Sequence, residues 1–243
     1  MDTQLVIEEY DSFIALKRFR EGGEFLELAA EAARNENDLA GELVITNELI
    51  GHYRKNDDEQ KCRAAIARAR ELLSSAEPDE ILTGTTFINM GTGYTRFGDF
   101  KAAIECFDAA EKAYAGNVSA RDKRWGALYN NRASALEAVG KYSEAEEYYS
   151  RALRLTRATD SIEDEAITCI NLADLAEKAG HTEKIKALLD RAWYLMSTVR
   201  NSDAYHAYVC EKLAPAFAHF DRADCAEKLM NKAETYGKIS SGR

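Results

Sequence analysis

The feature that most constrains the fold is a pattern of side-chain size that repeats about every forty residues. It is clearest over residues 126–155, where large and small apolar side chains recur at helical spacing on both sides of Gly140. These side chains form a stripe along one face of each predicted helix. The stripe comprises Tyr129, Ala133 and Leu136 before the glycine, and Tyr142, Ala145, Tyr149 and Ala152 after it. Small residues let a second helix approach closely, and the glycine supplies the left-handed conformation that ends a helix. The segment therefore predicts a hairpin of two helices.

Five other segments fit the same pattern, so the chain is expected to be built from six helical hairpins. Their turn positions, about 34 to 42 residues apart, are Gly23, Asp57, Gly98, Gly140, Gly180 and Asp221. The hairpins are expected at about 3–36, 38–75, 78–115, 119–158, 161–200 and 203–238. The helices of the first hairpin are expected at about 3–21 and 24–36. Repeated hairpins stack so that each contacts only its neighbours, which predicts a single elongated domain over residues 1–243.

Residues 91–114 (GTGYTRFGDFKAAIECFDAAEKAY) resemble tetratricopeptide repeats, and the roughly 40-residue period with GKYSEAEEYYSRAL is similar to the variety found in kinesin light chains. The resemblance covers nearly the whole chain, although Arg132 and Cys169 differ from the residues usual at their positions and Pro215 lies inside a predicted helix. The resemblance implies an all-α fold, a right-handed α-α superhelix of about six hairpins. It also implies that the first helices of the hairpins line a concave groove that binds protein segments.

A ladder of asparagines is the sharpest functional signal. Asn89, Asn131 and Asn171 each stand nine residues before a turn glycine, and Asn47 continues the series if Asn56 is its turn residue. At about 100° per residue, this position lies roughly 150° from the buried stripe. An amide carries a donor and an acceptor, so it can bond both groups of an extended peptide backbone. We expect these amides to face the groove and bind a peptide; the alternative is that they tie adjacent first helices together.

Other polar residues are expected on the same face. They comprise Asn130, Thr92, Ser134 and Asp174, with Arg96 and Lys178 as possible partners for a ligand carboxylate. A net charge of −10 and a pI near 5.1 argue against a nucleic acid or an anionic membrane as partner, because both require a basic patch. A neutral or basic protein segment fits better.

Catalysis and cofactor binding find little support in the sequence. Residues 90–98 (MGTGYTRFG) lack the Lys-Ser/Thr ending of a phosphate-binding loop, and Gly91 is expected to be a close-packing position. The chain contains no HExxH, GxSxG or CxxC motif. His206 and Cys210 lie four residues apart and could bind a metal, but a core thiol beside a surface imidazole is the more common arrangement. We therefore expect a non-enzymatic protein without a cofactor or a metal.

Two further functions remain open from sequence alone. A self-associating structural or regulatory protein could form a homodimer through its last hairpin, if Phe217, Phe220 and Met230 are exposed there. A small-molecule sensor could instead bind its ligand inside the superhelix. The five cysteines are expected to be reduced and packed, and the acidic start has no apolar run, so a cytoplasmic protein is expected.

Overall fold

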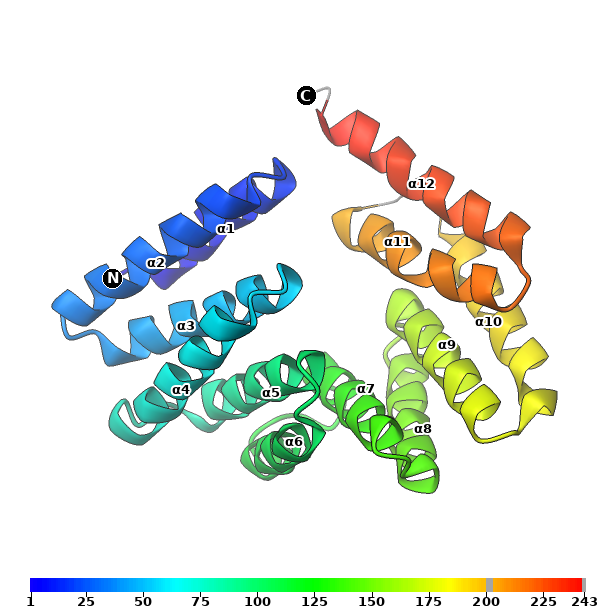
Figure 1. The fold of residues 1–243 in the computed structure, drawn as a ribbon, viewed down its shortest axis with the longest axis horizontal. Coiled ribbons are helices and arrows are strands. Elements are labelled where there is room, and N and C mark those ends of the chain that lie inside the picture. Colours follow the sequence, from blue (N-terminus) through cyan, green and yellow to red (C-terminus); the bar gives the residue numbers. More distant parts are fainter. Residues whose placement is uncertain (200–202, 242–243) are drawn as a thin grey trace. The chain divides into compact units, whose positions relative to one another are not determined.

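The computed structural model describes residues 1–199 and 203–241, and every regular element in these ranges is helical. In the described residues, twelve α-helices pair into six hairpins, which confirms the all-α prediction (Figure 1). The first six helices are α1 (Thr3–Ala15), α2 (Phe19–Asn35), α3 (Leu39–Lys55), α4 (Glu59–Ser75), α5 (Glu80–Arg96) and α6 (Phe100–Tyr114). The others are α7 (Lys123–Ala138), α8 (Tyr142–Ala158), α9 (Ile162–Lys178), α10 (Ile185–Thr198), α11 (Ala204–His219) and α12 (Ala223–Ser241), with a short 3-10 helix, η1 (Thr182–Lys184), before α10.

The chain divides into two compact units, residues 1–119 and residues 120–243. Unit 1 contains the hairpins α1–α2, α3–α4 and α5–α6, and unit 2 contains α7–α8, α9–α10 and α11–α12. Within unit 1, α3 contacts both α2 and α5; within unit 2, α9 contacts both α8 and α11 (Figure 1). Each unit is therefore a stack of neighbouring hairpins. A single domain over the whole chain stays a prediction.

In each hairpin, one residue in the left-handed conformation lies between the two helices. These residues are Lys17, Asp57, Gly98, Gly140, Gly180 and Asp221, with φ between +57° and +80°. Five of these turns were predicted, but the prediction for the first hairpin was wrong: its turn is at Lys17, and Gly23 lies inside α2. The first two helices accordingly span residues 3–15 and 19–35. With this correction, successive turns are 40 to 42 residues apart throughout.

Gly23 is required by packing and not by a turn. It is buried in α2, and a Cβ atom at this position would lie 2.5 Å from Nε2 of His52 on α3. A glycine that permits close approach and a glycine that permits a left-handed turn look alike in sequence. The six-residue shift of the turn also moves the buried face of α2, so that Leu26 is fully buried and Leu28 is 67% exposed.

Each unit has its own apolar core. In unit 1 the core includes Leu26, Ile50, Ile66, Leu72 and Met90. In unit 2 it includes Ile170, Leu189, Val209, Leu213 and Phe217. The five cysteines are all buried free thiols, as expected from sequence, and burial raises the pKa of the Cys62 thiol to about 11.

The last hairpin is more fully packed than its sequence suggested. Phe217 is fully buried, and its ring centre lies 6.2 Å from that of Trp193 on α10. Phe217 therefore does not supply the exposed apolar surface that self-association through this hairpin would use. Met230 is 40% exposed and Phe220 is half-buried.

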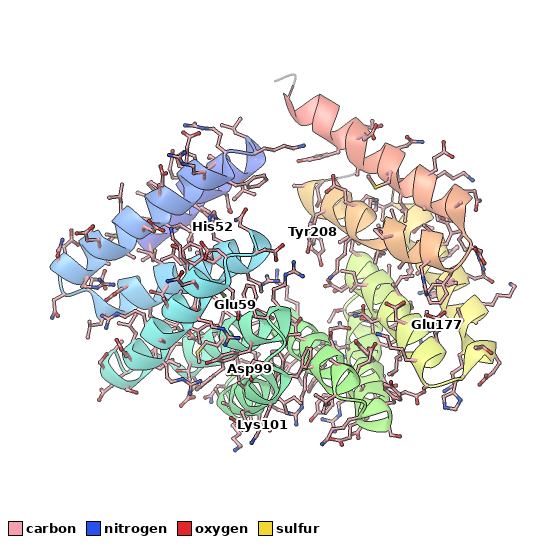
Figure 2. All side chains as sticks on the ribbon, viewed as in Figure 1. His52, Glu59, Asp99, Lys101, Glu177 and Tyr208 are labelled. Carbon is pink, nitrogen blue, oxygen red and sulfur yellow. The ribbon has the colours of Figure 1, made fainter. Side chains whose placement is uncertain are left out.

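A buried histidine makes the stability of unit 1 dependent on pH. His52 lies on α3 (Figure 2), is 6% exposed, and has Nδ1 3.1 Å from the hydroxyl of Tyr10. Burial lowers its pKa below the ordinary 6.5, and the nearby Lys55 and Lys61 act in the same direction against Glu27. The unfolded chain therefore binds more protons than the folded chain in mildly acidic solution. Stability is present above about pH 6.5 and is lost as the pH falls below that value.

We expect His52→Gln to flatten this pH dependence. The unfolded chain takes up a proton that the folded chain resists, so the free energy of unfolding of the native chain should fall between pH 7 and pH 5, by at most about 1.4 kcal/mol per pH unit for one proton. Urea denaturation at these two pH values measures the slope. His181→Gln, at an exposed histidine, is the control. Equal slopes for the native chain and His52→Gln would contradict this account.

Candidate functional site

The predicted peptide-binding residues lie on the first helices of four hairpins. Asn47 is on α3 and Asn89, Thr92 and Arg96 are on α5, all in unit 1. Asn130, Asn131 and Ser134 are on α7 and Asn171, Asp174 and Lys178 are on α9, all in unit 2. The two sets are therefore described separately, because each belongs to its own unit.

The same amide–hydroxyl bond joins adjacent first helices in both units. In unit 1, Nδ2 of Asn47 donates to Oγ1 of Thr86 on α5 at 2.9 Å, and Asn47 is only 5% exposed. In unit 2, Nδ2 of Asn130 donates to Oγ1 of Thr168 on α9 at 3.0 Å. Each asparagine stands ten residues before its turn, and each threonine twelve residues before the next turn. These amides tie neighbouring helices together, and the threonines at this recurrent position were missed in the sequence.

Asn171 extends this contact in unit 2. Its Nδ2 donates to Oδ1 of Asn130 at 3.3 Å, while Nδ2 of Asn130 also donates to the carbonyl of Gly126 at 3.2 Å. The side chain of Asn130 thus bonds both its own helix and α9. Asn171 is half-buried and uses one of its two amide protons in this bond.

Asn89 and Asn131 differ from the other amides. Both stand nine residues before a turn glycine, both are half-buried, and neither side chain makes a hydrogen bond within the part of the chain that the structure describes. A hydroxyl follows each three residues later on the same helix: Thr92, which donates to the carbonyl of Asn89 at 2.9 Å, and the exposed Ser134. Each unit therefore presents one amide with its donor and acceptor available, and a hydroxyl next to it.

The two predicted cations bind carboxylates of the preceding hairpin. Nε of Arg96 lies 2.6 Å from Oδ1 of Asp57. Nζ of Lys178 lies 2.5 Å from Oε1 of Glu137, and this hydrogen bond raises the pKa of Lys178. Both cations stand two residues before their turn glycine, so the same position reaches back to the neighbouring hairpin in both units. A ligand carboxylate would compete with these internal partners.

A second set of polar groups surrounds Glu137. This residue is 8% exposed and accepts a hydrogen bond of 3.0 Å from the hydroxyl of Tyr149 in addition to the one from Lys178. Asp174 is half-buried, and burial raises its pKa although Lys178 acts in the opposite direction. The carboxylates on this face of unit 2 are therefore partly desolvated.

The two residues considered for a metal site are both buried, and the histidine is paired with a carboxylate. Nδ1 of the buried His206 lies 2.9 Å from Oε1 of Glu163, and Cys210 is a buried thiol. Nε2 of His219 lies 2.8 Å from Oε2 of Glu177, which is labelled in Figure 2. Within residues 1–199 and 203–241, no group of three or more His, Cys, Asp or Glu side chains is placed to hold a metal ion. No helix in these ranges is long and apolar enough to cross a bilayer.

Comparison with known proteins gives one family and several similar folds. Residues 126–192 match the model of the tetratricopeptide repeat. The chain is 26% identical over 175 residues to the outer dynein arm-docking complex subunit 4 of Xenopus laevis, a match that covers 71% of this chain but only 31% of that protein. The chain thus spans about a third of the length of this curated relative.

Two solved structures resemble the chain over most of its length. The crystal structure of BtubC (BKLC) from P. vanneervenii has a TM-score of 0.65 and 18% identity, and the match covers 93% of each chain. The repeats of a putative kinesin light chain from Podosopora anserina have a TM-score of 0.58 and 16% identity, over 82% of this chain and 95% of that chain. At these identities the likeness shows the fold. Residues 126–192 thus match the tetratricopeptide repeat, and the helical hairpins of the chain have the fold of these two solved structures.

Proposed function

We propose that the chain is a non-catalytic interaction module that binds extended protein segments through first-helix amides, Asn89 in unit 1 and Asn131 in unit 2. Tetratricopeptide-repeat proteins generally mediate protein–protein interactions, so the fold supports the general role. The observation that carries the more specific proposal is that Asn89 and Asn131 are half-buried without an internal hydrogen-bond partner. A partly desolvated polar group without a hydrogen-bond partner carries a free-energy cost, and a ligand that makes the missing hydrogen bonds removes this cost.

The chemistry of an amide suits a peptide main chain. Its carbonyl accepts from a peptide N–H while its NH₂ donates to a peptide C=O, so binding depends little on the side chains of the ligand. In this proposal, Asn47, Asn130 and Asn171 contribute mainly by holding adjacent helices in register. Thr92, Ser134 and Asp174 border the binding amides, and the net charge of −10 favours a neutral or basic segment. The five free thiols suit a reducing compartment, and we place the protein in the cytoplasm on that ground.

The double variant Asn89→Ala with Asn131→Ala tests the proposal. Each substitution removes a donor and an acceptor, and each lost hydrogen bond costs about 0.5–1.5 kcal/mol. We expect the affinity for a peptide selected from a display library to fall by roughly ten- to a hundredfold. Fluorescence polarisation with the labelled peptide measures this change.

The controls separate a lost contact from a damaged fold. Asn231→Ala, at an exposed position on α12, should leave the affinity unchanged. Asn47→Ala should lower the melting temperature because it removes the bond to Thr86, whereas the double variant should melt near the native temperature. The proposal fails if the library yields no binder, or if the double variant binds as tightly as the native chain.

A further inference from the structure

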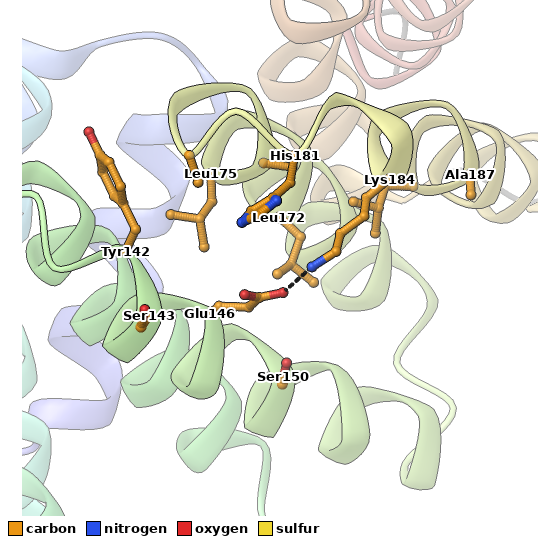
Figure 3. Close-up of a pocket in the computed structure, with 12 residues that line it drawn as sticks. Tyr142, Ser143, Glu146, Ser150, Leu172, Leu175, His181, Lys184 and Ala187 are labelled. Atoms are coloured by element: carbon orange, nitrogen blue, oxygen red, sulfur yellow. Dashed lines mark hydrogen bonds and ion pairs between the residues drawn. The ribbon is translucent and has the colours of Figure 1, made fainter.

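Unit 2 contains a pocket between α8, α9 and the start of α10 (Figure 3). Its volume is about 390 Å³, and its walls include the apolar side chains of Leu172, Leu175 and Leu188. Lys184 and Glu146 line it from opposite sides, and Nζ of the lysine lies 2.7 Å from Oε1 of the glutamate. Because an apolar cavity of about 150 Å³ already accommodates benzene, an aromatic ring fits in this space.

The internal repeat identifies the matching place in unit 1. The turn residues Asp57 and Gly180 are 123 residues apart, and Lys17 and Gly140 are separated by the same number. Helices α2, α3 and α4 of unit 1 therefore correspond to α8, α9 and α10 of unit 2 at this offset. The side chain that fills this place in unit 1 indicates what kind of group the pocket in unit 2 can bind.

In unit 1 this place holds a tyrosine ring. Tyr53 is 7% exposed, its hydroxyl donates to Oε1 of Glu27 at 2.6 Å, and Nζ of Lys61 lies 5.4 Å from the ring centre. At the offset of 123 residues, Lys61 corresponds to Lys184 and Tyr53 corresponds to Ala176. Unit 2 thus keeps the lysine and lacks the ring.

Among the six hairpins, only the one that contains Ala176 lacks a large side chain at this position. At the same position, four residues before the turn, the other hairpins carry Phe13, Tyr53, Tyr94, Leu136 and Phe217. Two neighbouring positions also change from polar in unit 1 to apolar in unit 2: His52 corresponds to Leu175, and Asn56 to Ala179. Two polar side chains beside the ring in unit 1 are thus apolar in unit 2, whereas Glu146 adds a carboxylate where unit 1 has Gly23.

We propose that this pocket binds a tyrosine side chain of a partner protein. The ring takes the place that the Tyr53 ring has in unit 1, with the ammonium of Lys184 near its face and Leu172 and Leu188 at its sides. Ser150 stands where Glu27 stands in unit 1, and the carboxylate of Glu146, one turn earlier on α8, accepts a hydrogen bond from the phenol hydroxyl. The pocket is partly open to solvent, so a ring can enter while attached to a chain. The site shares no residue with Asn89 or Asn131 and does not depend on the function proposed above.

Titration with N-acetyl-tyrosinamide, followed by NMR of leucine methyl groups, tests the proposal. A single side chain should bind with a dissociation constant in the millimolar range, roughly, given the cost of immobilising any ligand. We expect saturable shifts at the methyl groups of Leu172 and Leu188, and at least tenfold weaker binding of N-acetyl-leucinamide. Ala176→Tyr fills the pocket as Tyr53 does in unit 1, so it should abolish the shifts. Shifts that persist in a folded Ala176→Tyr protein would overturn the proposal.

Two more variants keep the test decisive if Ala176→Tyr does not fold. Tyr53→Ala should open a second site in unit 1, detected as new shifts at the methyl groups of Leu49, which lines that space. Lys184→Met should weaken binding about two- to fivefold by removing the cation next to the ring. An unchanged affinity in Lys184→Met would count against the proposal. Binding of 4-methylphenol without binding of N-acetyl-tyrosinamide would also overturn it, because the pocket would then accept only free phenols.

Discussion

Truncation of Phe107 to alanine is expected to lower the free energy of unfolding by about 3–5 kcal/mol, as for other fully buried aromatic residues. The ring is fully buried on α6 and lies against the backbone of Gly91 on α5. A Cβ atom at Gly91 would be 2.5 Å from Cε1 of Phe107, so no side chain other than hydrogen fits between them. The loss is a large fraction of the roughly 5–15 kcal/mol that stabilises a typical domain. Urea denaturation followed by circular dichroism measures it.

The glycine partner provides an independent test of the same contact. Gly91→Ala should destabilise the protein, and its cost should be smaller in a Phe107→Leu background, where the side chain that it meets is shorter. A coupling of at least about 0.5 kcal/mol between the two substitutions is expected for residues in contact. The matched control is Gly51→Ala on α3, where an added Cβ meets nothing within 4 Å. There the better helix propensity of alanine should leave stability unchanged or raise it by up to about 1 kcal/mol. Equal effects of the two glycine substitutions would contradict this account.

Much of the fold could be predicted because side-chain size and turn residues repeat with one period. The stripe after Gly140 predicts the buried face of α8, where Ala145, Tyr149 and Ala152 are at most 2% exposed, but its first residue, Tyr142, is 36% exposed. Gly91 was also identified as a close-packing position from its place in the pattern. The first hairpin failed because its turn residue is Lys17, which has no turn signature in sequence. Any residue can adopt a left-handed conformation at a modest energetic cost when packing on both sides fixes the turn.

The candidate site could be predicted less well, because a shift of one residue turns a helical side chain by about 100°. Asn47 joined the ladder only if Asn56 was the turn residue, but the left-handed residue is Asp57. Asn47 therefore stands ten residues before its turn, like Asn130, and reaches the neighbouring helix. The partners of these amides, and the missing ring at Ala176, become visible only when equivalent positions in different hairpins are compared. A contact between two hairpins depends on the residues of both hairpins. The residue pattern within one hairpin indicates only which of its own side chains are buried and which are exposed.

The same offset reveals a buried carboxylate held by two arginines in each unit. In unit 1, Glu42 on α3 is fully buried, with Oε1 2.8 Å from Arg34 and Oε2 2.7 Å from Arg68. In unit 2, the residues at the same offset repeat this arrangement: Glu165 is 4% exposed and its Oε1 accepts hydrogen bonds of 2.9 Å from Arg157 and Arg191. Each arginine pair joins the second helices of two successive hairpins to the first helix between them. The glutamate and its two arginines thus fix the stacking of neighbouring hairpins in each unit.

Glu42→Gln is expected to lower the free energy of unfolding by about 2–4 kcal/mol. Loss of one partner from a buried ion pair costs about 3–5 kcal/mol when the charge left behind is fully buried. Here the two guanidinium groups would be left facing each other, but the side chains of Arg34 and Arg68 are 55% and 32% exposed, and solvent reduces the cost. Glu24→Gln is the matched control, because Glu24 pairs with Arg20 on the surface of α2 and its loss should leave the stability almost unchanged.

The pH dependence of the same variant tests whether the charge of Glu42 is responsible. The hydrogen bond from Arg68 lowers the pKa of Glu42 below its ordinary 4.5, and Arg34 adds to this effect against the cost of burial. The folded chain therefore holds this carboxylate ionised where the unfolded chain begins to protonate it. Its stabilising contribution is complete above about pH 4.5 and is lost as the pH falls through the lowered pKa. The native chain should lose stability over this range more steeply than Glu42→Gln, so the two denaturation curves should converge in acid. If the difference in stability between the two proteins stayed constant from pH 7 to pH 3, the loss would have to be assigned to packing around the side chain and not to its charge.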